Sequence, residues 1–242
     1  MNSLFISGIK ISWDKISPDS YLKTIPFLRN LSQINLHKSI TLFTGENGSG
    51  KSTLLEAIAV AYGLNPEGGS RNFNFSTQNT HSDLHHAITL YKGPRKVCDA
   101  FFLRAESFYN VASKADEYSM GEDSYYNSYG GSSLHDQSHG ESFLNVILER
   151  FYPNSLYILD EPEAALSPQR QLTVLEQIYH LSQKGTQFII ATHSPILLGI
   201  PSAEILSFNG STIEPIDYYS TESYQITSLF VNHRDSLLKR LL

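Results

Sequence analysis

Eight residues in the first quarter of the chain, Gly45 to Ser52, read G-E-N-G-S-G-K-S and match the phosphate-binding loop pattern G-x-x-x-x-G-K-S. An apolar strand pattern at residues 40–44 precedes the loop, and an apolar helical pattern begins near Lys51. A loop of this kind needs a strand before it and a helix after it, so the surrounding sequence supports the match. The pattern predicts a nucleoside triphosphate site in an α/β fold.

Each residue type in this loop has a physical reason to be there. The glycines lack a Cβ, so the backbone can take positive φ and bring several N–H groups close to one phosphate. The Lys51 ammonium adds positive charge beside the terminal phosphates, and the Ser52 hydroxyl can bind Mg²⁺. We therefore expect a nucleoside triphosphate bound together with Mg²⁺. The nucleotide-binding residues predicted from the loop are Gly45, Glu46, Asn47, Gly48, Ser49, Gly50, Lys51, Ser52 and Thr53.

A second apolar run, Leu156 to Leu159, ends in the pair Asp160-Glu161 and is typical of a Walker B strand. Two carboxylates at the C-terminal end of a buried parallel strand suit this chemistry, because open α/β sheets bind their ligands there. Asp160 is predicted to bind Mg²⁺ together with Ser52, and Glu161 to accept a hydrogen bond from the attacking water. The alternative, an acidic pair that only ends a surface strand, is disfavoured by the intact phosphate-binding loop.

Length and composition fit one α/β domain. At 242 residues and 40% apolar, the chain can bury one substantial core, or a core plus a small subdomain. We predict a single P-loop NTPase domain over 1–242, with a mixed sheet flanked by helices and an insertion subdomain at about 64–150. No apolar stretch is long enough to span a membrane, and residues 1–13 alternate like a strand. We therefore expect no membrane insertion, no cleaved signal and a cytoplasmic location.

Charge and cysteine content limit the chemistry further. The single cysteine, Cys98, excludes an internal disulfide, and its place in an apolar run predicts a buried, inert thiol. A net charge of −6 gives no general affinity for nucleic acid. Lys92, Arg95 and Lys96 form a local basic cluster, for which a solvated loop face is favoured over a nucleic-acid patch.

The middle of the chain is polar. Residues 116–136 carry four tyrosines among Gly and Ser and show neither helical nor strand periodicity, so we expect a loop. Such a segment suits an adaptable contact surface for a ligand or partner, but an ordinary exposed loop explains it equally well.

The last third of the chain alternates helical and strand patterns. Ser167 and Ser194 are each followed by proline and predict helix starts, with an apolar run at 188–191 as the strand between them. A hairpin is expected around Asn209-Gly210, and a helical pattern begins at about Ser223. This order of elements is typical of a parallel sheet covered by helices.

Three further motifs indicate which P-loop class the chain resembles. The sequence S-H-G-E at 138–141 opens an apolar helical pattern, A-L-S at 165–167 follows the Walker B pair, and His193 ends the next strand pattern. Together with both Walker motifs, they resemble the ATP-binding-cassette class. The resemblance is to its cytosolic branch, shared with SMC, RecF and OLD proteins and the bacterial AAA, ATP-binding-cassette-like ATPases, and it extends over essentially the whole chain. A Ser-x-Gly-Glu sequence before a helix is also a common N-cap arrangement.

The resemblance implies roles for these motifs. Ser138, Gly140 and Glu141 stand where the family signature S-G-G-Q has its Ser, second Gly and Gln, and are implied to bind ATP. Residues 165–167 correspond to the D-loop, and His193 to the switch histidine that touches the γ-phosphate.

Two positions depart from the family pattern. His139 replaces the first signature Gly and Ser167 replaces the usual D-loop Asp, so the transporter form of the motif is not met. Glu106, at the end of a strand pattern, takes the position of the Q-loop Gln and is implied to be a further metal ligand. The catalytic residues implied are Lys51, Glu161 and His193.

The resemblance also implies a function. ATP is expected to lie on the phosphate-binding loop of one subunit and under the signature helix of a second, in a homodimer with two shared sites that hydrolyses ATP to ADP and phosphate. The segment between Lys51 and Ser138 is too short for a long coiled-coil arm, so the chain would be an isolated head. DNA metabolism or antiviral defence, with a nuclease or DNA client, is the expected setting. An ATP-dependent dimerisation switch with little turnover and the motor subunit of a transporter are the alternatives.

Overall fold

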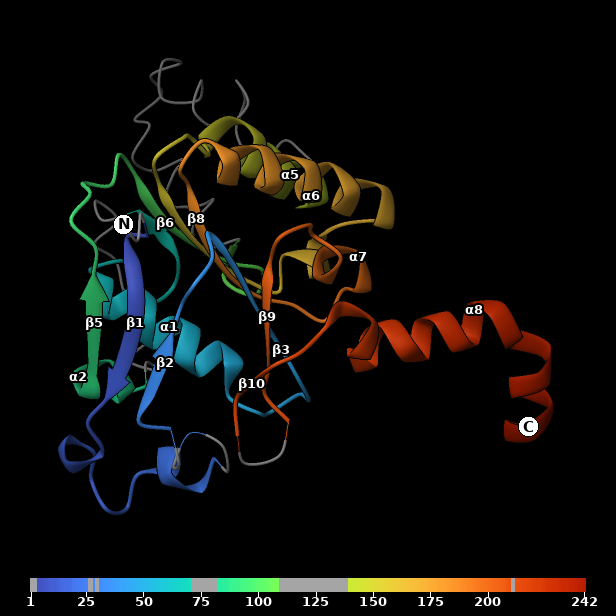
Figure 1. Cartoon of the computed structure of the whole chain (residues 1–242), viewed down its shortest axis with the longest axis horizontal. Coiled ribbons are helices and arrows are strands. Elements are labelled where there is room, and N and C mark those ends of the chain that lie inside the picture. Colours follow the sequence, from blue (N-terminus) through green and yellow to red (C-terminus); the bar gives the residue numbers. More distant parts are fainter. Residues whose placement is uncertain (1–3, 26–27, 29–30, 71–81, 109–138, 210–211) are drawn as a thin grey trace.

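Within the described residues, seven strands form a mixed sheet at the centre of the molecule (Figure 1). The computed structural model describes residues 4–25, 28, 31–70, 82–108, 139–209 and 212–242. The strand order is β10-β9-β3-β8-β7-β6-β4, with β9 to β6 parallel and the two outer strands antiparallel. The strands are β3 (Ile40–Thr44), β4 (Gly69–Ser70), β6 (Ala100–Arg104), β7 (Leu156–Asp160), β8 (Gln187–Ala191), β9 (Glu204–Ser207) and β10 (Glu214–Pro215).

The middle strands of this sheet are continuous apolar runs because both of their faces are covered. Every residue of β3, β7 and β8 is buried. A parallel arrangement also aligns the C-terminal ends of these strands at one edge of the sheet. The predicted fold class, an α/β domain with a mixed sheet flanked by helices, is confirmed.

A smaller antiparallel sheet covers one side of the molecule. It consists of β2 (Gln33–Asn35), β1 (Ile6–Ile11) and β5 (Ile88–Lys92), with β1 in the middle. Its apolar side chains share one core with helix α1 (Lys51–Tyr62) and with the near face of the large sheet. The strand predicted in the first 13 residues is confirmed.

Gln187 ties the small sheet to the large one. Its buried side-chain Oε1 accepts hydrogen bonds from the N–H groups of Phe5 at 2.8 Å and Ile6 at 2.9 Å, and its Nε2 donates to the Ile6 carbonyl at 2.8 Å. All these bonds are buried, so the Gln187 amide supplies one acceptor and one donor to the backbone of residues 5 and 6, where the chain enters β1.

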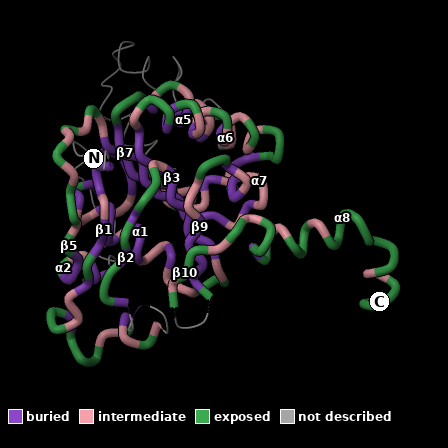
Figure 2. Tube along the Cα trace, in the orientation of Figure 1, coloured by how far each residue is buried: buried purple, intermediate pink, exposed green. Residues whose placement is uncertain are grey.

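Helices α5 (His139–Arg150), α6 (Pro168–Gln183) and α7 (Pro195–Leu198) pack on the opposite face of the large sheet, over a second core (Figure 2). The side chains of Ser167 and Ser194 accept backbone N–H bonds at the first turns of α6 and α7, so both predicted helix starts are confirmed. In this core the Tyr157 ring stacks on Phe151 with centroids 3.8 Å apart.

The remaining elements are short, apart from the last helix. They are η1 (Trp13–Lys15), η2 (Tyr21–Thr24), α2 (Leu84–Ala87), η5 (Pro162–Ala165), η6 (Tyr218–Ser220) and α8 (Glu222–Leu241). Helix α8 buries none of its residues and extends away from the body of the molecule, with a non-helical residue at His233 (Figure 1). The predicted hairpin is β9-β10, whose turn includes residues outside the described ranges, and the predicted C-terminal helix is α8.

The prediction for Cys98 is wrong, because this residue is exposed. Strand β6 begins only at Ala100, so the first part of the apolar run lies in the connection before the sheet. In the basic cluster noted in the sequence, two residues pack on aromatic rings. The Arg95 guanidinium lies 4.9 Å from the Phe5 ring centroid, and the Lys92 ammonium lies 4.8 Å from the Tyr62 ring centroid. The predicted tyrosine-rich loop at 116–136 lies outside the described residues, and the predicted subdomain at 64–150 remains a prediction.

Replacing Tyr157 by Phe tests how much the buried hydroxyl group of Tyr157 contributes to stability. Burial raises the pKa of Tyr157 to about 12, so the native state keeps this proton while the unfolded chain loses it near the ordinary value of 10. The stability that the phenol contributes is therefore lost as pH rises from 10 to about 12. Its oxygen accepts from the Tyr152 N–H at 2.7 Å, so we expect the parent to be about 1 kcal/mol more stable than Tyr157→Phe near pH 8.

Urea unfolding across this pH range should show the difference disappear near pH 11. Tyr21→Phe, at an exposed tyrosine, is the matched control and should differ little from the parent at any pH. A difference between the parent and Tyr157→Phe that does not change with pH would contradict the prediction.

Candidate nucleotide site

The loop after β3 has the backbone that its glycines were predicted to provide. Gly45, Gly48 and Gly50 have φ of 143°, 75° and 85°. A Cβ at Gly45 would lie 2.6 Å from the Phe208 carbonyl oxygen, so a side chain there would collide with the chain after β9. A Cβ at Gly48 would meet nothing within 4 Å, so this side of the loop is open among the described residues. The loop is therefore a cradle of the kind that binds phosphate through its N–H groups.

Lys51 is the first residue of α1 and is buried within the loop. Its Nζ donates to the carbonyl oxygens of Gly45 and Glu46, both at 2.8 Å, and to Ser49 Oγ at 3.3 Å. Burial lowers the pKa of Lys51, and the nearby carboxylates, with Glu161 the strongest, act in the opposite direction. The loop thus holds one cation at its centre, opposite the acidic residues that end β7.

Ser52 and Asp160 form a pair of oxygen donors. Ser52 Oγ donates to Asp160 Oδ1 at 2.9 Å, and Asp160 is buried at the end of β7. Burial raises the pKa of Asp160 to about 6, against the opposing effects of Arg104 and Ser52. A hydroxyl and a carboxylate are the hard ligands that Mg²⁺ prefers.

This donor set fits a metal that is shared with phosphate. The described residues contain no cluster of three or more His, Cys, Asp or Glu side chains that could hold an ion without other ligands. Mg²⁺ usually takes one or two protein ligands and completes its shell with phosphate oxygens and water. The Ser52–Asp160 pair beside the phosphate-binding loop meets this requirement.

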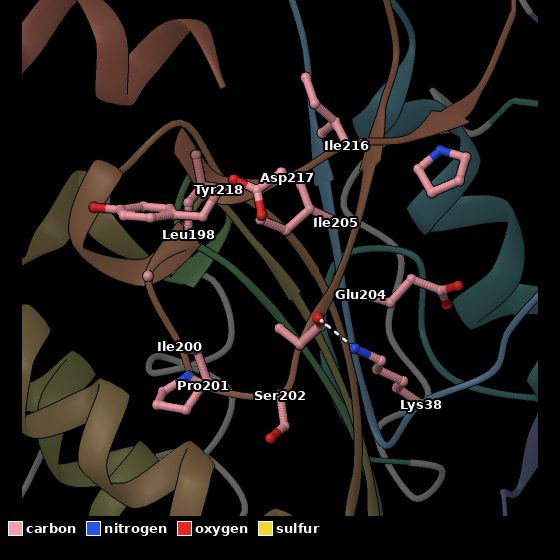
Figure 3. Close-up of a pocket in the computed structure, with 13 residues that line it drawn as sticks. Lys38, Leu198, Ile200, Pro201, Ser202, Glu204, Ile205, Ile216, Asp217 and Tyr218 are labelled. Atoms are coloured by element: carbon pink, nitrogen blue, oxygen red, sulfur yellow. Dashed lines mark hydrogen bonds between the residues drawn. The ribbon is translucent and has the colours of Figure 1, made fainter. Parts of the chain in front are cut away.

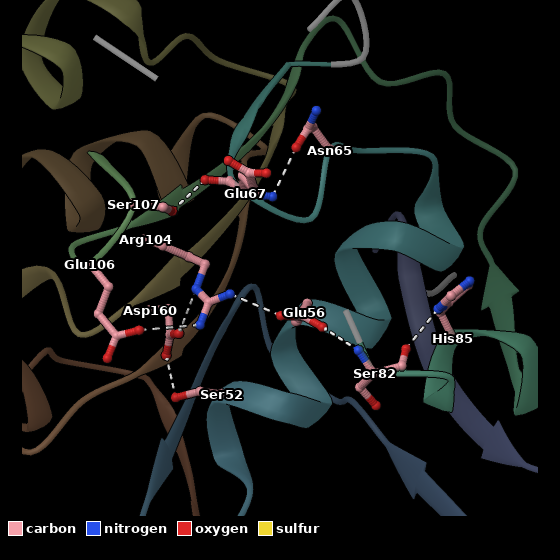
Figure 4. A network of polar contacts seen from close by, with 10 residues as sticks. All are labelled: Ser52, Glu56, Asn65, Glu67, Ser82, His85, Arg104, Glu106, Ser107 and Asp160. Atoms are coloured by element: carbon pink, nitrogen blue, oxygen red, sulfur yellow. Dashed lines mark hydrogen bonds and ion pairs between the residues drawn. The ribbon is translucent and has the colours of Figure 1, made fainter. Parts of the chain in front are cut away.

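Arg104 joins the predicted metal ligands from the neighbouring strand (Figure 4). It ends β6 directly beside Asp160, and its Nε lies 3.4 Å from Asp160 Oδ2. Its other nitrogens contact Glu56 Oε2 on α1 at 2.8 Å and Glu106 Oε2 at 3.5 Å. The Glu106 side chain is 84% exposed and is connected to Asp160 through the guanidinium. Glu106 stays a prediction as a metal ligand, and no motif in the sequence singled out Arg104 or Glu56.

Glu161 and His193 face each other across the ends of β7 and β8. Glu161 has φ 50° and ψ 52°, a left-handed conformation that costs a non-glycine residue about 1–3 kcal/mol. Its Oε1 lies 3.8 Å from His193 Nε2, and each side chain is about one third to two fifths exposed. Burial and the Lys51 charge lower the pKa of His193, against the opposing effect of Glu161 and other carboxylates, and so favour the neutral ring. The three predicted catalytic residues therefore share one region.

The predicted signature residues begin α5. Ser138 lies outside the described residues, and Gly140 and Glu141 form the first turn. A Cβ at Gly140 would lie 2.6 Å from the Ala165 carbonyl oxygen, so η5 packs closely on this turn. Glu141 Oε1 pairs with Arg170 of α6 at 3.2 Å. The start of α5 is thus fixed against η5 and α6 of its own chain.

A cavity of about 510 Å³ lies elsewhere, between α7, β9, β10 and η6 (Figure 3). Its walls include Leu198, Ile200, Ile216 and Tyr218, and Lys38 Nζ donates to the Ala203 carbonyl at its side. Among the described residues that line it, none belongs to the predicted nucleotide site. This cavity is therefore separate from the place where the phosphate chemistry is expected.

A family comparison agrees with the geometry. The model of the AAA domain family matches residues 21–186, which is more than half of the chain. The chain belongs to this family. No curated protein sequence matches it.

Three solved structures resemble the fold at a distance. A metal-chelate type ABC transporter in an inward-facing conformation has 21% identity and a TM-score of 0.45, over 82% of this chain and 80% of that one. The SMC head domain from Thermotoga maritima has 15% identity and a TM-score of 0.46, over 88% and 100%. Ribosome-bound archaeal Pelota and ABCE1 gives 16% identity and a TM-score of 0.44, over 82% and 33%.

The family match places the chain among the AAA domains, and the sheet topology agrees with the predicted P-loop α/β fold. Nucleotide binding is the property that this class and the loop geometry share. In the described part of the chain, no helix has the length and apolar character needed to cross a membrane.

Replacing Asp160 by Asn tests how much stability is lost by burying the charge of this carboxylate. The pKa of Asp160 is raised from 3.8 to about 6 in the native state. The stability that its neutral carboxyl contributes is therefore fully present below about pH 4 and is lost as pH rises through about 6. Without Mg²⁺, we expect Asp160→Asn to be about 1 kcal/mol more stable than the parent near pH 7.5, with no difference near pH 4. Urea unfolding in the presence of a chelator measures this.

The control is Asp235→Asn, whose carboxylate is 94% exposed and should change stability little at either pH. If Asp160→Asn is less stable than the parent near pH 7.5, the carboxylate is a net stabilising group and the prediction is wrong.

Proposed function

We propose that this protein is an Mg²⁺-dependent ATPase that hydrolyses ATP to ADP and phosphate. The observation that carries this proposal is the 2.9 Å contact between Ser52 of the phosphate-binding loop and Asp160 at the end of β7. It brings together two motifs far apart in sequence in the way that a metal shared with a triphosphate needs. Glu161 follows directly and supplies a carboxylate for the water.

In this proposal each residue has one task. The loop N–H groups and the Lys51 ammonium bind the terminal phosphates and neutralise their charge. Ser52 and Asp160 hold Mg²⁺, with Glu106 as a further oxygen ligand, and the metal supplies charge neutralisation at the phosphates when bound. Glu161 orients and polarises the attacking water, and His193 contacts the γ-phosphate.

The active form in this proposal is a homodimer with two shared sites. In this proposal the start of α5, with Gly140 and Glu141, offers backbone N–H groups to an anion, as the phosphate-binding loop does, and Ser138 is the predicted signature residue that precedes it in sequence. Its packing on η5 and α6 of the same chain holds this turn in place, and in the proposal the turn serves the nucleotide of a second copy. Hydrolysis would then remove the bridging phosphate and loosen the pair.

The proposed setting is DNA metabolism or antiviral defence with a nuclease or DNA client. The net charge of −6 disfavours direct, non-specific DNA binding, so a partner protein is the expected route. Turnover measured with and without DNA separates a working ATPase from an ATP-dependent dimerisation switch with little turnover. Co-purification with a membrane protein would favour a transporter motor instead.

Glu161→Gln tests the chemistry. We expect it to bind ATP like the parent but to turn over at least about 10²-fold more slowly, because water activation is lost while the binding groups remain. Lys51→Ala should instead weaken ATP binding, because it removes the charge beside the β- and γ-phosphates. Fluorescent-nucleotide titration and steady-state hydrolysis measure both. Parental turnover in Glu161→Gln removes Glu161 from its role, and tight binding by Lys51→Ala places the nucleotide elsewhere.

Dimer formation is tested with the same Glu161→Gln variant. We expect Glu161→Gln to become a dimer with ATP and Mg²⁺ at micromolar concentration, as measured by light scattering. Adding Ser138→Arg should keep it monomeric and leave ATP binding nearly unchanged, because a bulky cation would stand where N–H donors approach the partner's phosphate. Ser17→Arg, at an exposed serine, is the matched control and should dimerise. Equal dimerisation with Ser138→Arg would contradict the shared site.

A further inference from the structure

Glu163 bridges the loops that follow β7 and β8. It lies on η5, two residues after Glu161, and its Oε1 accepts two backbone hydrogen bonds from the other loop. The donors are the N–H of His193 at 2.6 Å and the N–H of Ser194 at 3.1 Å. Bonds from N–H to an ionised carboxylate are among the stronger hydrogen bonds in proteins.

The backbone of His193 depends on this carboxylate. Among the hydrogen bonds of the described residues, the His193 N–H has no acceptor other than Glu163, whereas the Ser194 N–H also donates to Thr192 Oγ1 at 3.1 Å. Loss of the Glu163 side chain would therefore leave one N–H without its partner and the other with a local one.

The His193 ring has no anchor of its own in the described part of the molecule. Its buried Nε2 makes no hydrogen bond there, and its separation of 3.8 Å from Glu161 Oε1 is longer than a hydrogen bond. The ring position is consequently set by the backbone, and through the backbone by Glu163.

Stability alone does not account for Glu163. Its second oxygen, Oε2, is buried and makes no hydrogen bond to a described residue. A buried acceptor without a partner costs about 1–3 kcal/mol, and more when it is charged. Such groups are uncommon and tend to occur where function requires them.

The turn that carries Glu163 also contacts the start of α5. The Ala165 carbonyl oxygen leaves no room for a side chain at Gly140, and Arg170, just beyond the turn, pairs with Glu141. One short segment thus contacts both the His193 loop and the helix that carries the predicted signature.

We infer that Glu163 is a positioning residue, whose carboxylate holds the 193–194 backbone so that the His193 ring faces Glu161, and that η5 passes this constraint to the start of α5. The inference rests on the proposed ATPase function for its effect on turnover. The tether itself is a property of the protein without nucleotide.

The experiment compares the parent with Glu163→Ala and Glu163→Gln. Glu163→Ala removes the acceptor, and Glu163→Gln keeps one oxygen that can accept the same bonds. Glu176→Ala, on α6 with a side chain 71% exposed, is the control for removal of a glutamate from the surface. Each variant is measured for hydrogen exchange of the backbone around 192–198 without nucleotide, for ATP affinity and for kcat.

We expect faster exchange in Glu163→Ala, ATP affinity within about 3-fold of the parent, and kcat lower by about 10-fold or more, because misplacement of an aligned group costs rate rather than binding. Glu163→Gln should keep the slow exchange and at least about a third of kcat. Glu176→Ala should match the parent in all three measurements.

Three results would overturn the inference. The first is parental exchange and kcat in Glu163→Ala. The second is a Glu163→Gln protein as impaired as Glu163→Ala, since the position would then act through its charge rather than as an acceptor. The third is a loss of ATP affinity equal to the loss of kcat. If the parent hydrolyses no ATP, the proposed function fails, while hydrogen exchange still decides whether Glu163 holds the loop.

Discussion

Parallel pairing of β3, β8, β7 and β6 is the constraint on which the site depends. In this register Asp160 of β7 lies beside Ala191 of β8 on one side and beside Arg104 of β6 on the other. Ala191 in turn lies beside Phe43 of β3. The residues that follow the strand ends, from the phosphate-binding loop to His193, therefore share one edge of the sheet. A shift of one residue between any two strands would separate the groups and exchange the side chains that the two cores receive. The two cores that cover the sheet hold this register.

The site costs stability, and the surrounding structure offsets it. Burial keeps Asp160 and Lys51 away from their ordinary pKa values, and Glu161 has a backbone conformation that few non-glycine residues adopt. Arg104 and the Ser52 hydroxyl favour the charged form of Asp160 and so recover part of the cost. A charge that is expensive in the folded protein alone is one that a divalent ion would stabilise on binding. The buried charge of Asp160 thus weakens the fold without a metal and favours binding of a divalent ion.

The sequence allowed prediction of those parts of the site that are local. The strand, glycine loop and helix around Lys51, the apolar run ending in Asp160-Glu161 and the helix starts at Ser167 and Ser194 are short patterns with fixed spacing. Cys98 was wrongly predicted because an apolar run does not show at which residue the strand begins.

The contacts of Arg104 and Glu163 could not be predicted, since they depend on which strands become neighbours and on how a turn is oriented.

Gln187 shows a last consequence of the same topology. Its amide binds the backbone of Ile6 in β1 across a separation of 181 residues, and β8 also pairs with β3. During synthesis β3 therefore leaves the ribosome long before its partner strands β8 and β9 exist. Closure of the central sheet has to wait until β8 and then β9 have emerged, so this domain completes its fold late in translation.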